Sequence, residues 1–244
     1  MGVKPGKTKK SRDLEAPVGN RPEDFLNRGI KAAVGALPVL GGPLNEFIAF
    51  AIGDPAQERR DDFMQAVYDR ILDLEKEFDQ LERANLRSNE QFQATFIQAS
   101  RLAVSTASDE KRKILQNAIL NSALGSIDEN VRQIFMTFVE RFTPLHAAIL
   151  QVFNNPAANE AAKTRAAHLS MGGLGLIIQA AIPDLQGQDA LANRLVSDLE
   201  SSALLNGASL NVTMTGQGLM ASRTTELGRA FLQFISDPQT GTVP

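Results

Sequence analysis

The sequence predicts a mostly α-helical protein: a multi-helix bundle followed by a winged-helix-like module with one small β-hairpin. Helix start signals recur along the chain, and between them apolar side chains return every three or four residues. One short stretch near the C-terminus alternates apolar and polar residues instead, which is typical of a strand. We expect a disordered basic tail (1–21), a helical bundle region (22–142), a winged-helix-like module (143–236) and a flexible C-terminal tail (237–244).

The basic tail is separated from the rest by its charge. Residues 1–21 carry a net charge of +4, whereas the whole chain carries −3, so the remainder carries −7. A basic segment with glycine, proline and almost no bulky apolar residue is expected to be disordered. The basic residues are followed by polar residues rather than by an apolar stretch, so the tail does not resemble a secretory signal.

The most apolar run, GALPVLGGPLNEFIAFAI, covers residues 35–52. The longest uncharged stretch around it has 14 residues, 32–45, and it is broken at Pro38, Gly41, Gly42 and Pro43. A single membrane span needs about 18 to 20 apolar residues, so this run does not predict one. We expect a helix–turn–helix corner packed on the bundle. Membrane contact by residues 30–52 is kept as an alternative.

Five cap-like patterns predict where helices begin. They are Asp54-Pro55, Ser88 with Gln91, Ser126 with Glu129, Thr143-Pro144 and Asn155-Pro156. A Ser, Thr, Asp or Asn side chain accepts a hydrogen bond from a free N–H of the first turn, and proline suits the first helical position. The spacing that follows predicts helices over residues 54–83, 89–107, 109–124, 127–142 and 143–153.

The helix predicted over residues 54–83 has one narrow apolar seam and an acidic outer surface. The seam consists of Phe63, Val67, Ile71, Leu74, Phe78 and Leu81. Such a seam packs on other helices, either in the core or on a partner. We take Phe63, Val67 and Ile71, together with Phe47, as the candidate interaction residues. The simpler interpretation is that each of them is buried in the protein's own core.

The C-terminal part changes pattern. A glycine-interrupted segment is stopped by Pro183, and an amphipathic helix follows over residues 189–205. The stretch SLNVTMTGQGLMASRTT then predicts a hairpin with its turn at Gly216-Gln217-Gly218, and a last helix runs from Thr225 to Ile235. Helices followed by a hairpin and a helix are typical of a winged helix-turn-helix unit.

Winged helices often bind DNA, and this function needs positive charge on the recognition helix and the wing. The predicted recognition helix has one arginine, Arg194, against three acidic residues, and Arg223 and Arg229 lie near the wing. Residues 143–236 hold five basic and six acidic residues. This charge favours packing or protein contact, and a DNA-binding regulator using these three arginines is kept as an alternative.

Little in the composition favours catalysis. The chain has no cysteine, two histidines and one tyrosine, which removes most nucleophiles and general bases and fits a reducing cytoplasm. GVKPGKT at residues 2–8 is one residue short of a phosphate-binding loop, and GQGLMA at residues 216–221 is better explained as the hairpin turn. Neither His146 nor His168 has a carboxylate at ligand spacing. We therefore expect no cofactor, no metal and no enzymatic activity.

Two consecutive segments resemble a known group of proteins. KILQNAILNSALGSID and RQIFMTFVERFTPLHAAILQVF are similar to segments of small bacterial helical proteins of the Abi-alpha-like abortive-infection type. The matching positions are Leu115, Ala118, Ile119, Leu120 and Ala123, followed by Phe142-Thr143-Pro144. The resemblance covers about 40 residues and carries no catalytic residue. It implies an accessory bacterial protein that limits phage growth.

Taken together, these patterns predict a cytoplasmic, non-enzymatic bacterial interaction or regulatory protein within a phage-defence or stress-response system. We expect it to act by packing helices against a protein partner or a second copy of itself. The alternatives are the DNA-binding regulator, a membrane-active effector using residues 30–52, and an enzyme with an unfamiliar carboxylate site.

Overall fold

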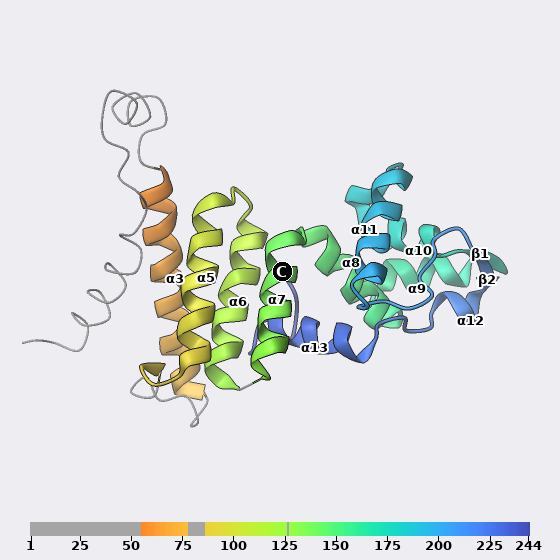
Figure 1. The fold of residues 1–244 in the computed structure, drawn as a ribbon. Helices are drawn as coiled ribbons and strands as arrows, with labels where there is room; N and C mark the ends of the chain where they lie inside the picture. The colour runs from red at the N-terminus through yellow and green to blue at the C-terminus, as the bar shows by residue number, and fades with distance from the viewer. Residues whose placement is uncertain (1–54, 78–85, 126) are drawn as a thin grey trace, which may run out of the picture. The chain divides into compact units, whose positions relative to one another are not determined.

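A computed structural model describes residues 55–77, 86–125 and 127–244, all within one compact unit that spans residues 41–244. It confirms the predicted fold class: the described chain is mostly helical and contains one small antiparallel pair of strands (Figure 1). The predicted basic tail, the apolar run 35–52 and Phe47 lie outside the described residues. No described helix is both long and apolar enough to span a bilayer.

Four long helices form the first part of the described chain. They are α3 (Pro55–Glu77), α5 (Glu90–Ser105), α6 (Asp109–Leu124) and α7 (Glu129–Arg141). They lie side by side in chain order (Figure 1), with α5 in contact with α3, α6 and α7. The predicted apolar spacing explains this arrangement, because each helix turns its seam towards its neighbours.

Two predicted caps are wrong by one or two residues. Asn89 rather than Ser88 caps α5, where its side-chain oxygen accepts a hydrogen bond from the Phe92 N–H at 2.9 Å. Asp128 rather than Ser126 caps α7. In both places an Asn or Asp follows the serine closely, and its carbonyl or carboxylate oxygen reaches the free N–H groups of the first turn equally well.

The last helix, α13 (Glu226–Ile235), comes from the C-terminal part of the sequence and packs against these helices. It packs on α6, α7 and α8. Phe231 of α13 lies against three phenylalanines, with ring centroids 5.4 Å from Phe135, 5.6 Å from Phe138 and 6.1 Å from Phe142. Offset and edge-on contacts at these distances are favourable for aromatic rings.

Amide side chains of α6 hold the end of α13. Asn117 donates to the Ile235 carbonyl at 2.8 Å, and Asn121 donates to the carbonyls of Phe234 and Ser236. The last carbonyls of a helix have no partner within it, so these amides satisfy groups that would otherwise be buried without a bond. Arg70 of α3 adds an ion pair with Asp237 at 2.6 Å.

Shorter elements connect α7 to α13. In order they are α8 (Pro144–Asn154), the 3-10 turn Pro156–Ala158, α9 (Glu160–Ala167), β1 (Met171–Gly173), α10 (Leu174–Ala181), the 3-10 turn Pro183–Leu185, α11 (Asp189–Ser201), β2 (Thr213–Thr215) and α12 (Gly216–Leu219). The predicted Thr143-Pro144 start of α8 is confirmed, and Pro183 ends α10 as expected.

The strand pair is not the local hairpin that the sequence predicts. β2 falls where a strand is expected, but it pairs with β1, so that Met171 lies opposite Thr215 and Gly173 opposite Thr213. The predicted turn at Gly216-Gln217-Gly218 is wrong, because the Thr215 hydroxyl accepts from the Gly218 N–H and begins α12. β1 contains two glycines, so its sequence lacks the alternation of apolar and polar residues by which a strand is recognised. A Cβ on Gly173 would lie 2.7 Å from the Leu210 carbonyl oxygen, so this close approach requires glycine.

Candidate functional site

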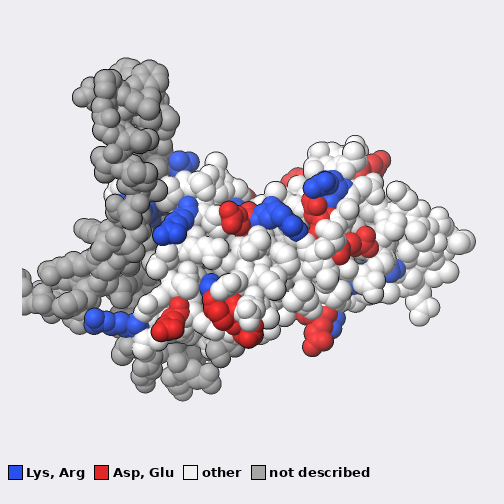
Figure 2. Space-filling view, in the orientation of Figure 1, with Lys and Arg blue, Asp and Glu red and all other residues white. Residues whose placement is uncertain are grey.

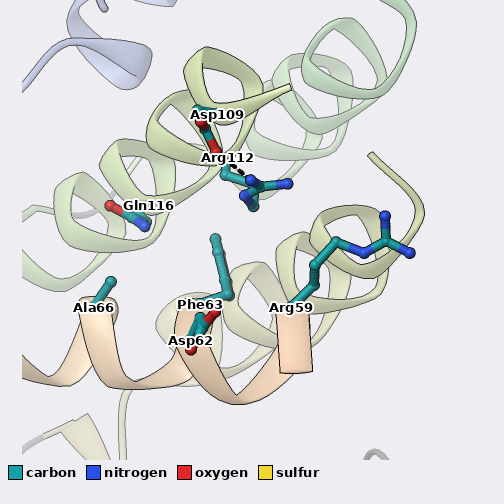
Figure 3. A pocket seen from close by; sticks show the side chains of 7 residues that line it. All are labelled: Arg59, Asp62, Phe63, Ala66, Asp109, Arg112 and Gln116. Atoms are coloured by element: carbon teal, nitrogen blue, oxygen red, sulfur yellow. Dashed lines mark hydrogen bonds and ion pairs between the residues drawn. The ribbon is translucent and has the colours of Figure 1, made fainter. Parts of the chain in front are cut away.

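A hollow of about 230 Å³ lies between α3 and α6 (Figure 3). It is lined by Arg59, Asp62, Phe63, Ala66, Asp109, Arg112 and Gln116. Its lining includes two arginines and two aspartates, and Arg112 already binds Asp109 and donates to the Thr106 carbonyl at 2.9 Å. The two positive and two negative side chains balance, and one ion pair is already formed. The lining of the hollow therefore has no net charge that would attract a charged ligand.

The candidate interaction residues lie beside this hollow, inside the core. Phe63 is 2% exposed, Val67 1% and Ile71 5%. They belong to α3, which packs on α5 and α6. Their side chains are therefore buried in the protein's own core, and almost none of their surface is exposed for a partner to bind.

The three arginines considered for DNA binding each bind the protein itself. Arg194 Nε lies 2.9 Å from the Asp198 carboxylate. Arg223 is half-buried and donates to the carbonyls of Gly207 and Gly218, which ties the loop before β2 to α12. Arg229 donates to the Thr224 carbonyl at 2.9 Å. Asp198 balances the charge of Arg194, whereas Arg223 and Arg229 keep their charge but already use part of their guanidinium groups to bind backbone carbonyls.

A polar junction joins α8 to α11 and was not predicted from the sequence. His146, in the first turn of α8, is 5% exposed, and its Nε2 lies 3.7 Å from the Asp198 carboxylate of α11. Arg141, the last residue of α7, donates to the Ser202 hydroxyl at the end of α11. The guanidinium of Arg141 lies 4.9 Å from the centre of the Phe142 ring, and the His146 ring stacks on the same phenylalanine.

A buried ammonium supports this junction from α6. Lys111 donates to the carbonyls of Val139, Glu140 and Phe142 at the end of α7. Positive charge at a helix C-terminus is favourable because the last carbonyls point at it. Burial lowers the pKa of Lys111 to about 8, and the Glu140 carboxylate opposes this, so the ammonium remains the main form at neutral pH.

The opposite part of the molecule has almost no charge. Residues 169–183 and 201–222 contain no Lys, Arg, Asp or Glu, and they supply β1, α10, β2 and α12. These elements contact one another, so the two segments form one surface, which we name the uncharged region. On the face drawn in Figure 2, coloured side chains gather over the longer helices and few appear near the small sheet.

The uncharged region also carries the most exposed large apolar side chains of the described residues. Met171 is 60% exposed and Val212 54%, one at each end of the strand pair. An open hollow of about 380 Å³ lies along α10, lined by Arg165, Leu176, Gln179, Ala180 and Gln186. Depletion of charge together with exposed methionine and aliphatic side chains is typical of the centre of protein interfaces.

Among the described residues, no three His, Asp or Glu side chains group in a way that could hold a metal ion. His168 is exposed at the end of α9, apart from the junction at His146. One signal for His146 was present in the sequence: it lies three residues after Thr143, the position at which a capping box places Glu or Gln.

No protein-family model matches this chain, and no curated protein and no solved structure matches it significantly.

Proposed function

We propose that this chain is a non-enzymatic protein that acts by binding another protein chain, a partner or a second copy, through the uncharged region. The observation that carries the proposal is the exposure of Met171 and Val212 on a surface without charge. Such a surface is poorly hydrated compared with the charged faces of the long helices, so covering it is favourable.

The strand pair supplies polar groups for the same contact. Each strand has three residues and the sheet has two strands, so each strand has one edge that pairs with no other strand of the sheet. Hydroxyl and amide side chains around them, such as Thr213, Thr215 and Gln179, can hydrogen-bond without the cost of burying a charge.

The biological setting is carried by the resemblance alone. The similarity of residues 113–153 to Abi-alpha-like proteins supports a cytoplasmic bacterial protein within a phage-defence or stress-response system. A binding surface without a catalytic centre suits such an accessory role. Growth of the host under phage challenge, with and without this chain, tests that setting separately from the binding surface.

The binding experiment compares three forms of the full chain: wild type, the double variant Met171→Ser/Val212→Ser, and a control with an exposed apolar residue of α7 replaced, Ile134→Ser. Sedimentation measures self-association across a concentration series, and affinity capture from host lysate identifies partners. We expect wild type and I134S to share an association that the double variant loses.

Identical behaviour of all three forms in both measurements would contradict binding through the uncharged region. Loss of the association in I134S but not in the double variant would place the interface on the long helices instead.

The DNA-binding alternative predicts a different result. Non-specific duplex at low salt gives phosphate contacts their greatest strength, and we expect no retention of the chain there, because Arg194, Arg223 and Arg229 are bound internally. Retention that falls steeply with added salt would favour the regulator over the protein-binding function.

A further inference from the structure

The junction between α7, α8 and α11 contains a buried histidine whose two nitrogens have different surroundings. Nδ1 of His146 accepts a hydrogen bond from the backbone N–H of Thr143 at 3.0 Å, which is the return bond of the capping box of α8. An N–H donor facing Nδ1 fixes the neutral tautomer, with the ring proton on Nε2. That Nε2 makes no hydrogen bond to any described residue.

We propose that His146 is a pH-sensitive switch: protonation turns Nδ1 from an acceptor into a donor, breaks the return bond from the Thr143 N–H in the capping box of α8 and changes how α11 is held at the junction. This device is independent of binding at the uncharged region. A glutamine at the same position would make the same return bond at every pH, whereas histidine adds the ability to titrate and the ring that stacks on Phe142.

Both consequences of protonation follow from the geometry. The added proton on Nδ1 points at the Thr143 N–H, so two donors face each other and the first turn of α8 loses a bond. The Thr143 hydroxyl oxygen, also 3.0 Å from Nδ1, is the group that can accept a hydrogen bond from the new Nδ1–H. On the other side, the charged Nε2–H is drawn to the Asp198 carboxylate, now 3.7 Å away.

The charged groups around the ring come from three helices. Asp198 on α11 faces Nε2 and is itself bound by Arg194 of the same helix. Lys111 on α6 and Arg141 on α7 place positive charge near the ring, and the carboxylate of Glu140 acts on Lys111. Two cations and a buried site therefore oppose a charged imidazole, and one carboxylate favours it.

The balance favours the neutral ring in the folded protein. Burial lowers the pKa of His146; Asp198 raises it, and Lys111 and Arg141 lower it again, with a net lowering from 6.5. As pH falls, the unfolded chain therefore takes up the proton first. The stability that the neutral ring provides is complete above about pH 6.5 and decreases below it.

Nuclear magnetic resonance of the wild-type chain tests the switch directly, since only two histidines are present. The variant His168→Gln assigns the remaining signal to His146. We expect a proton on Nε2 and none on Nδ1 at pH 7.5, conversion to the charged ring only below pH 6.5, and a shift of the Thr143 amide signal with the same midpoint. A proton on Nδ1 at pH 7.5, or a Thr143 amide that ignores the transition, would overturn the proposal.

Thermal unfolding between pH 7.5 and 5.5 gives the second measurement. We expect the Tm of wild type and of H168Q to fall by about 2–4 °C more than that of His146→Gln over this range. The same pH dependence in H146Q and wild type would contradict the switch. If H146Q does not fold, the resonance titration of the wild-type chain decides alone.

Discussion

The helices α3, α5, α6 and α7 have between 13 and 23 residues and charged outer faces. By contrast, α9, α10 and α12 have eight residues or fewer, and the segments that form the uncharged region hold no charged side chain. The first region buries most of its apolar side chains, although Ile97 and Ile134 are 38% and 45% exposed. The second leaves Met171 and Val212 more exposed, at 60% and 54%, on a surface without charged side chains, and this difference is the basis of the proposed binding surface.

The largest effect is expected in the aromatic core that α13 shares with α7. Phe231→Ala removes a ring that contacts three other phenylalanines, and we expect a loss of about 3–5 kcal/mol in the free energy of unfolding. Urea denaturation measures it, and exposed Gln233→Ala on the same helix serves as the control. Equal midpoints for the two variants would show that α13 does not stabilise the first region.

The junction comes next. Lys111→Met keeps the stem of the side chain but leaves three carbonyls at the end of α7 without their ammonium donor, and we expect a loss of about 2–3 kcal/mol. Lys113→Met removes an exposed lysine of the same helix and controls for net charge. A larger loss in K113M than in K111M would contradict the buried role of Lys111.

Gly173→Ala tests the packing inside the uncharged region. A methyl group there meets the Leu210 carbonyl oxygen at 2.7 Å, so the strand pair has to shift, and we expect a cost of about 1–3 kcal/mol. The control is Gly125→Ala in the first region, where no atom lies within 4 Å of the added methyl. Amide exchange of β1 and β2 reports where the shift occurs; unchanged exchange and stability in G173A would refute the close approach.

The smallest effect on stability is expected at the surface. Met171→Ser/Val212→Ser removes side chains that are mostly exposed, so its free energy of unfolding should stay within about 0.5 kcal/mol of wild type for each substitution. Calorimetry of the same samples used for sedimentation checks this. A large loss would mean that these side chains stabilise the fold, and lost association in that variant would no longer indicate a binding surface.

The sequence predicted the first region well because its signals are local. The spacing of Phe63, Val67 and Ile71 by four residues can be read within a single segment of the chain, and so can the cap of α8 at Thr143. The helix predicted over residues 109–124 has those bounds in the structure. The two misplaced caps show the limit of such signals, since adjacent Ser, Asn and Asp residues compete for the same turn.

The second region could not be predicted in the same way, because contacts between distant segments decide it. β2 has a strand pattern, but its partner is three residues with two glycines in another part of the chain. Nor does spacing reveal that Asp198 faces His146, since the pairing of α8 with α11 brings them together. For the candidate interaction residues Phe63, Val67 and Ile71, the periodic spacing could not show whether they form part of the core or a binding surface.

The position of α13 has a consequence for biosynthesis. Its last carbonyls bind Asn117 and Asn121, and its Phe231 fills a space bounded by α7, although about a hundred residues of sequence lie between them. A nascent chain has made α3, α5, α6 and α7 long before α13 leaves the ribosome. Until then those helices lack the side chains that complete their core, so the completed fold forms only after α13 has been made.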